Sequence, residues 1–189
     1  MMYIAVVSDP AESPPVKAAG RFDLHLDVRA MERIEAARKH APLRAFLANV
    51  NANDSIFSTI GCKVWRTTEA AGDKPYVFAS RIDLTFLQEA ANFGRGPHQN
   101  LANRLSQLLT REPAEALRAE LRISPVEFAG EDRGFCLRVI LCARGATPEQ
   151  AEVRWGLGLA RLQQALLFVA RGLRHQTEAG DHQKMDTAG

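Results

Sequence analysis

The chain has 189 residues, a length that suits one well-buried domain and is short for two. Its 24 Lys and Arg side chains nearly balance 22 Asp and Glu, and the formal net charge of +2 argues against a dedicated nucleic-acid-binding protein. The three cysteines have no Cys-x-x-Cys spacing, which is typical of a reducing compartment and argues against disulfides and a zinc site.

The sequence shows neither a secretory signal nor a membrane-spanning segment. Its longest apolar run, around Leu157 to Ala170, is interrupted by Arg161, Gln163 and Gln164. Arg outnumbers Lys and Ala is abundant, a bias that a GC-rich coding sequence explains. We therefore expect a cytoplasmic protein, bacterial in character, that does not contact a membrane.

The N-terminal part is predicted to contain strands followed by helices. An apolar run over residues 3–7 indicates a short strand, and residues 22–28 alternate apolar and polar, which predicts a half-buried strand. Helical spacing then predicts a helix over residues 28–40. Pro42 ends or kinks this helix, and a second helical piece is expected over residues 43–50.

The middle of the chain is predicted to form a long β-hairpin followed by helices. Apolar and polar side chains alternate over residues 56–67 and again over 76–86. The pattern becomes helical from 86 to 93, a further helix is expected over 98–109, and Pro113 is expected to open a short helical turn that ends near Ala119.

A second hairpin precedes the C-terminal helix. Residues 121–128 and 135–144 alternate, and Pro125, which removes a backbone donor where the apolar phase shifts, predicts a bulge or an edge strand. Thr147 and Gln150 form a capping box, with Gln150 expected to reach back to the amide of Thr147, and Pro148 at the first helical position marks the start of the helix.

The C-terminal helix carries an apolar ridge at steps of three and four residues. The ridge consists of Trp155, Leu159, Leu162, Leu166, Val169 and Leu173. Gly156 and Gly158 interrupt good helix formers, which indicates close packing inside the fold. The alternative is a helix–helix dimer contact through Gly156 and Ala160.

Together these elements follow the order ββα, ββαα, ββα. They predict an α+β fold: an antiparallel β-sheet built from hairpins, covered on one face by helices that include the long C-terminal helix. Residues 1–175 are expected to form this single domain. Residues 176–189 are expected to form a disordered polar tail, since they contain almost no core-forming side chain.

The first candidate site is Asp23, His25 and Asp27, which share one face of the predicted strand and could bind a divalent metal. The run Asp23-Leu24-His25-Leu26-Asp27 resembles the first metal-binding motif of metallophosphoesterases. That family's later metal motifs do not follow downstream, so a solvated strand face is favoured and no cofactor is expected.

The second candidate is the start of the helix near residue 98, where Arg95 and His98 could hold an anion beside free backbone amides. No phosphate-binding loop accompanies them, so a plain turn and helix cap is favoured.

The third candidate is a basic surface of Arg122, Arg138 and Arg144, which share the outward face of the last hairpin by phase. RNA recognition would need stacking aromatics on that face. Phe128 and Phe135 are expected to point inward, so a protein contact is favoured over nucleic acid.

No group of titratable residues indicates catalysis. We therefore expect a non-catalytic binding or regulatory protein that acts through macromolecular contacts with a protein partner or a second copy of itself. The alternative is a small-molecule-binding protein or small hydrolase. Trp155-Gly156, followed by Leu159, Arg161-Leu162 and Leu166, resembles the C-terminal helix of helix-grip ligand-binding domains, although the predicted helices over 29–50 and 98–119 depart from that fold. The resemblance implies a cavity between helix and sheet, lined by Trp155, Leu159, Phe78 and Val139.

Overall fold

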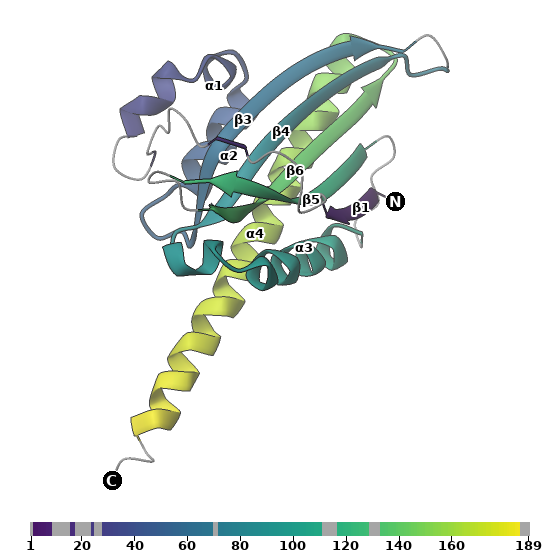
Figure 1. Ribbon diagram of the computed structural model, residues 1–189. Coiled ribbons are helices and arrows are strands. Elements are labelled where there is room, and N and C mark those ends of the chain that lie inside the picture. Colours follow the sequence, from purple (N-terminus) through teal and green to yellow (C-terminus); the bar gives the residue numbers. More distant parts are fainter. Residues whose placement is uncertain are drawn as a thin grey trace.

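The computed structural model describes residues 2–8, 16–17, 24, 28–69, 72–110, 117–128 and 133–185 (Figure 1). Side chains are described within these ranges, except those of residues 7, 8, 16, 17, 28 and 175–185. The elements are β1 (Tyr3–Ser8), β2 (Val16–Lys17), the 3₁₀ helix η1 (Val28–Arg33), α1 (Glu35–Lys39), α2 (Ala41–Val50), β3 (Phe57–Thr68), β4 (Tyr76–Phe86), the 3₁₀ helix η2 (Glu89–Asn92), α3 (Arg95–Thr110), β5 (Leu117–Glu127), β6 (Arg133–Gly145) and α4 (Pro148–Met185).

The sheet is mixed, so the prediction of a purely antiparallel sheet is wrong. Its strands lie in the order β1-β5-β6-β4-β3, and β2 also pairs with β5. Both predicted hairpins, β3–β4 and β5–β6, are confirmed as antiparallel pairs, and β4 pairs antiparallel with β6. However, β1 and β2 run parallel to β5. The protein is therefore an α+β protein with a mixed sheet.

Pro125 does not create a bulge, because β5 keeps one register with β6 through the Pro125–Phe135 pair. On the other side of β5, the β1 ladder ends at Ile123 and the β2 ladder begins at Val126. Pro125 thus lies between two ladder segments, where its missing N–H breaks no described hydrogen bond. The predicted bulge is therefore wrong, and so is the alternative of an edge strand, because β5 lies between β1 and β6 in the sheet.

The change in apolar phase at Pro125 has a different cause. Val126 and Phe128 are buried with Cys136 in a small second cluster, against which Ile60 packs. Phe128 therefore belongs to this second cluster, and its ring centroid lies 5.9 Å from that of Phe93. Both phenylalanines were expected to point inward: Phe135 packs against the main core, whereas Phe128 is buried in the second cluster.

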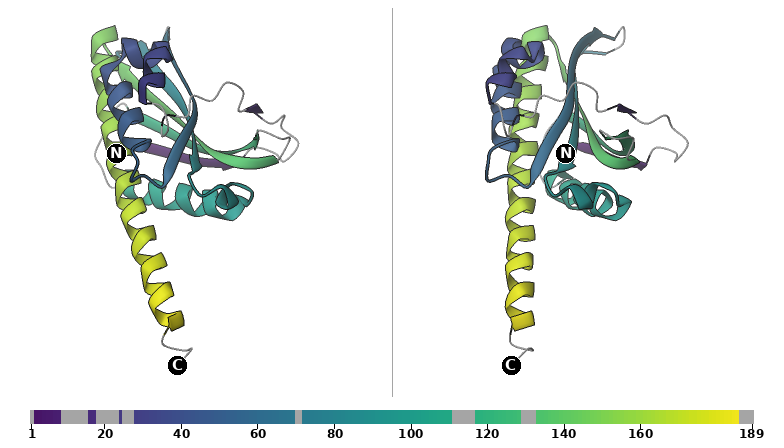
Figure 2. Two further views of the ribbon diagram at one scale, coloured as in Figure 1. Left: turned by 90° about the vertical axis from the view of Figure 1, so that its left-hand side faces the viewer. Right: turned by 60° about the vertical axis from the view of Figure 1, so that its left-hand side comes forward.

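The long helix α4 lies along one face of the sheet (Figure 2), and its predicted ridge is the centre of the main core. All six ridge residues belong to this core cluster, with Leu173 at its partly buried margin. The Trp155 indole N–H donates to the Ser80 hydroxyl at 2.8 Å, so the helix and β4 are joined by a buried hydrogen bond as well as by packing. This arrangement confirms the predicted contact between the ridge and the sheet.

The two glycines of α4 pack inside the fold. A Cβ on Gly158 would lie 2.9 Å from Leu141 Cδ2, and one on Gly156 would lie 3.1 Å from Pro42 Cγ of α2. Close packing, and not a dimer contact through Gly156, therefore accounts for both positions.

Several element ends differ from the predictions. Residues 28–40 form η1 and α1 in place of one helix, and η2 is a short 3₁₀ helix. The predicted turn from 113 to 119 is wrong for residues 117–119, which begin β5. The predicted strand over 22–28 falls mostly outside the described residues, but Leu24 is a buried turn residue.

The ends of α4 also differ in detail. The Thr147 hydroxyl accepts from the Gln150 amide at 3.2 Å, as predicted, but the Gln150 side chain accepts from the Ala146 amide at 2.7 Å. The helix backbone continues to Met185, whereas the sequence predicted a disordered tail from residue 176. The division into a domain and a tail stays a prediction.

Candidate functional sites

The face of α4 turned away from the sheet carries a second apolar stripe. We call it the outward α4 stripe, and it consists of Val153, Leu157, Ala160, Gln164, Leu167, Phe168 and Arg171. Apart from the neighbours Leu167 and Phe168, these residues follow one another at steps of three and four, and all of them lie on one helical face. Val153, Leu157, Leu167 and Phe168 are 64%, 57%, 41% and 66% exposed, so the largest apolar side chains of this face remain in contact with solvent.

The inward ridge was predicted from the sequence, and the outward stripe was not. Arg154, Arg161 and Arg174 lie between or beside its apolar residues and give the far side of the helix a polar composition. The signal was nevertheless present, because Val153, Leu157 and Ala160 follow the same three-and-four spacing as the ridge.

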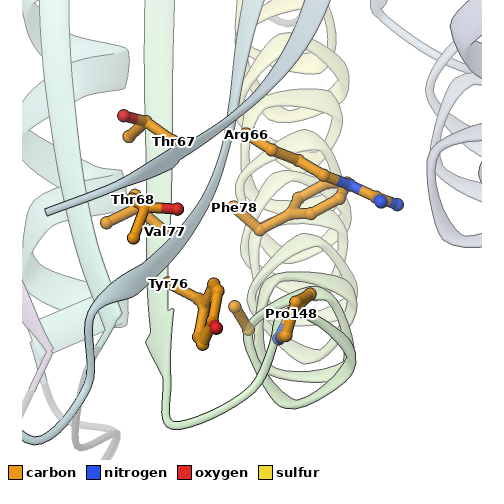
Figure 3. A pocket seen from close by; sticks show the side chains of 8 residues that line it. Arg66, Thr67, Thr68, Tyr76, Val77, Phe78 and Pro148 are labelled. Carbon is orange, nitrogen blue, oxygen red and sulfur yellow. The ribbon is translucent and has the colours of Figure 1, made fainter.

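A pocket of about 240 Å³ lies between the sheet and the first turn of α4 (Figure 3). It is lined by Arg66, Thr67, Thr68, Tyr76, Val77, Phe78, Pro148 and Ala151. The side chains of Tyr76 and Phe78 point toward the helix, and the Arg66 guanidinium carbon lies 5.0 Å from the centre of the Phe78 ring. The pocket combines an apolar floor with a cationic and hydroxylic rim, which suits a small ligand with one polar end.

A polar chain borders this pocket. The Glu152 carboxylate accepts from Arg66 at 2.7 Å and lies 2.8 Å from His40 Nδ1. The His40 ring meets Phe78 and Trp155 edge-on, at 5.2 Å and 5.8 Å between centroids. Glu152 therefore fixes both the imidazole and the guanidinium beside the pocket. Neither Arg66, Glu152 nor His40 was a sequence candidate, because they come from distant parts of the chain.

The cavity expected between Trp155, Leu159, Phe78 and Val139 is filled at its centre. All four side chains are buried in the core, and the rings of Phe78 and Trp155 lie 4.6 Å apart between centroids. The pocket lies at the edge of this packed region.

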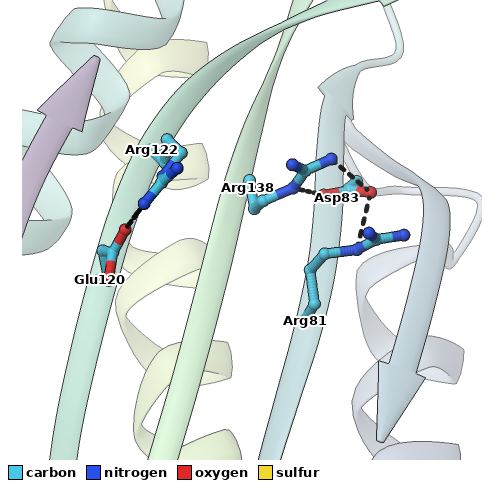
Figure 4. Close-up of polar contacts among 5 residues, drawn as sticks. All are labelled: Arg81, Asp83, Glu120, Arg122 and Arg138. Atoms are coloured by element: carbon cyan, nitrogen blue, oxygen red, sulfur yellow. Dashed lines mark hydrogen bonds and ion pairs between the residues drawn. The ribbon is translucent and has the colours of Figure 1, made fainter. Parts of the chain in front are cut away.

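The three predicted basic residues lie on the other face of the sheet, and each has an acidic partner; Figure 4 shows those of Arg122 and Arg138. Arg138 Nε donates to Asp83 at 2.7 Å and Arg122 Nε donates to Glu120 at 2.9 Å. Arg144 pairs with Glu69. Register places Arg122 directly opposite Arg138, while Arg144 lies further along β6. The ion pairs reduce the positive charge that this surface can offer to a ligand.

Asp83 is the buried centre of this network. Asp83 is 1% exposed, and the Nε atom of Arg81 lies 3.4 Å from its Oδ2 atom. Two guanidinium groups thus hold one buried carboxylate, which is a structural requirement because an unpaired buried charge is costly.

The residues of the predicted anion site lie in different environments. Arg95 is exposed at the start of α3, whereas His98 is fully buried against Phe86, with ring centroids 5.1 Å apart. Burial lowers the pKa of His98 to about 4, so its imidazole is neutral at neutral pH. Neither ring nitrogen has a hydrogen-bond partner among the described residues. An anion site here would depend on Arg95 and backbone amides, and it stays a prediction.

Asp23, His25 and Asp27 lie outside the described residues. Within the described part of the chain, no three His, Cys, Asp or Glu side chains are arranged to hold a metal ion. In the same residues, none of the helices has the length and apolar content needed to cross a membrane.

Comparison with known proteins adds no relative: no protein-family model, no curated protein and no solved structure matches this chain. The class that the structure defines is an α+β protein whose mixed sheet is packed against a long C-terminal helix.

Proposed function

We propose that this is a non-catalytic binding protein that acts through contacts between the outward α4 stripe and a protein partner. The observation that carries the proposal is the exposure of Val153, Leu157, Leu167 and Phe168 on one helical face. A helix that is apolar on two faces is ordinarily buried on both, and the sheet covers only one face of α4. Exposed apolar surface of this kind is typical of protein–protein interfaces.

The position of α4 supports this proposal. The stripe spans residues 153–171, the part of α4 that packs on the sheet with its opposite face, and the end of α4 beyond it extends past the sheet and α3 (Figure 1), so a partner can reach the outward face. Two hollows flank the stripe near Leu167 and Phe168. One lies against Leu108 of α3 and the other against Val50 of α2. Buried aromatic side chains that fill pockets near the centre of an interface are frequent anchors, and Phe168 is the aromatic residue of this stripe.

Site-specific photo-crosslinking in cells tests the proposal. A photoreactive phenylalanine analogue replaces Leu157, and the matched control carries it at Lys39, an exposed helical position of α1. The expected result is a defined protein adduct at position 157 that is absent at position 39. Loss of this adduct in a Phe168→Glu background is also expected. Equal labelling at both positions, or none at either, contradicts the proposal.

A second function is favoured by the pocket between the sheet and α4. Its volume of about 240 Å³ lies slightly below the usual range of about 300–1,000 Å³ for small-molecule sites, so it suits only a small ligand. Arg66 keeps further donors beside the one it gives to Glu152, and together with the apolar floor they favour a small aromatic carboxylate. NMR titration with benzoate-like fragments should then shift the amides of Val77 and Ala151. Arg66→Gln should abolish these shifts, whereas the exposed control Arg44→Gln should not.

A further inference from the structure

We propose that the partner of the outward α4 stripe is a second copy of this chain, with the two α4 helices packed antiparallel about a two-fold axis beside Ala160. This inference rests on the proposed function, because it names the partner of the same surface. It requires the surface to be complementary to itself when one copy is reversed.

The order of side chains along the stripe meets that requirement. When the axis passes between Ala160 and Arg161, Val153 of one copy lies opposite Phe168 of the other, Leu157 lies opposite Gln164, and Ala160 lies opposite Arg161. Ala160 is exposed beside the axis, where its small side chain leaves room for the Arg161 side chain of the other copy. A two-fold contact of this type uses the same patch on both copies and closes on itself.

The charges at the two ends of the stripe favour the antiparallel direction. Glu149 is exposed in the first turn of α4. Arg171 and Arg174 are exposed beyond the midpoint of the same helix, at the other end of the stripe. Its backbone hydrogen bond and the Thr147 side chain lower the pKa of Glu149, so it is ionised at neutral pH.

In an antiparallel pair, Glu149 of each copy lies beside Arg171 of the other. In a parallel pair, Glu149 would face Glu149 and Arg171 would face Arg171, which is unfavourable. The stripe therefore presents an acidic end, an apolar centre and a basic end, and a reversed second copy presents the matching sequence.

Analytical ultracentrifugation of the purified full chain, over a wide concentration range, tests self-association. Wild type is expected to form a dimer. Leu157→Glu combined with Phe168→Glu should weaken it at least about a hundredfold, because both carboxylates would be buried in an apolar contact. The matched control is Leu87→Glu, which changes a leucine that is 50% exposed outside the stripe and should leave the dimer unchanged.

Charge reversal tests the direction of packing. Glu149→Arg should weaken the dimer about two- to tenfold, as expected for exposed ion pairs that occur twice in the assembly. Adding Arg171→Glu to the same chain should restore it.

Cysteine cross-linking gives an independent readout of direction, with wild type as the background for the three native cysteines. A mixture of Val153→Cys and Phe168→Cys chains should cross-link, while neither variant should cross-link with itself. Self-cross-linking of each variant alone would indicate parallel packing and overturn the proposed geometry.

The outcomes separate this inference from the proposed function. A protein that stays monomeric at all concentrations, yet gives a position-157 adduct with a different protein in cells, refutes self-association and leaves the binding function intact. A monomer without any adduct refutes both. A dimer that the Leu157→Glu and Phe168→Glu changes leave intact refutes the assignment of the stripe.

Discussion

The burial of His98 predicts a specific loss of stability in mild acid. The side chain is fully buried, burial lowers its pKa to about 4, and the ordinary value of 6.5 applies once the chain unfolds. The unfolded chain therefore binds more protons than the folded chain between these two values, so stability falls as the pH decreases from 6.5 to 4. A difference of one pKa unit between the folded and unfolded chain corresponds to about 1.36 kcal/mol. Protonation of His98 on unfolding therefore lowers the free energy of unfolding by up to about 3 kcal/mol.

The assay is urea denaturation at several pH values between 7.5 and 4, applied to wild type and to His98→Leu. Leucine fills a similar volume beside Phe86 and does not titrate, and it also removes two buried nitrogens without described partners. The variant should be at least as stable as wild type at pH 7. Its stability relative to wild type should then increase by up to about 3 kcal/mol as the pH falls. Parallel pH profiles for the two proteins would refute the assignment of a buried neutral imidazole.

Five substitutions test the packing of α4 and the buried ion network by urea denaturation. Gly158→Ala should destabilise by up to about 2 kcal/mol, since a Cβ 2.9 Å from a leucine methyl outweighs the gain in helix propensity, whereas Gly172→Ala, with nothing within 4 Å, should stabilise by about 1 kcal/mol. Ser80→Ala should cost about 1–3 kcal/mol because the buried indole N–H of α4 loses its acceptor, and an unchanged stability would contradict that role. Arg138→Met should cost about 3–5 kcal/mol by leaving a buried carboxylate poorly paired, and adding Asp83→Asn should recover part of the loss.

Local patterns in the sequence predicted local structure well. The two hairpins follow from strict alternation, and the start of α4 follows from Thr147 and Gln150, since these signals involve neighbouring residues. The parallel pairing of β1 with β5 joins Tyr3 to Arg118, and no periodicity within either segment encodes that contact. The mixed character of the sheet was therefore not predictable from periodicity.

The candidate sites divide in the same way. His98 precedes Leu101 by three residues and Leu105 by seven, so its place on the buried face of α3 was readable from spacing, although it was predicted to be an anion ligand. The polar chain of Arg66, His40 and Glu152 beside the pocket could not be predicted from the sequence. These residues come together only when β3, the start of α2 and α4 pack against one another. Spacing identifies the face on which a side chain lies, and tertiary packing determines what that side chain meets.

The magnitude of the apolar contribution predicts how strong the α4 dimer should be. Each copy offers four large apolar side chains that are 41–66% exposed, so a two-fold contact buries the remaining half of eight side chains. At about 1.5–3 kcal/mol for complete burial of each, that is worth about 6–12 kcal/mol. Association costs about 4–15 kcal/mol, so the two ranges largely cancel, and a dimer forms only if the association cost lies near the low end of its range. A net gain of about 4–8 kcal/mol, which such a low cost allows, corresponds to a dissociation constant in the millimolar to micromolar range. Sedimentation equilibrium should therefore show a mass that rises with concentration above about 10 μM. A dimer that persists at nanomolar concentration would mean that surfaces other than the outward α4 stripe hold the two copies together.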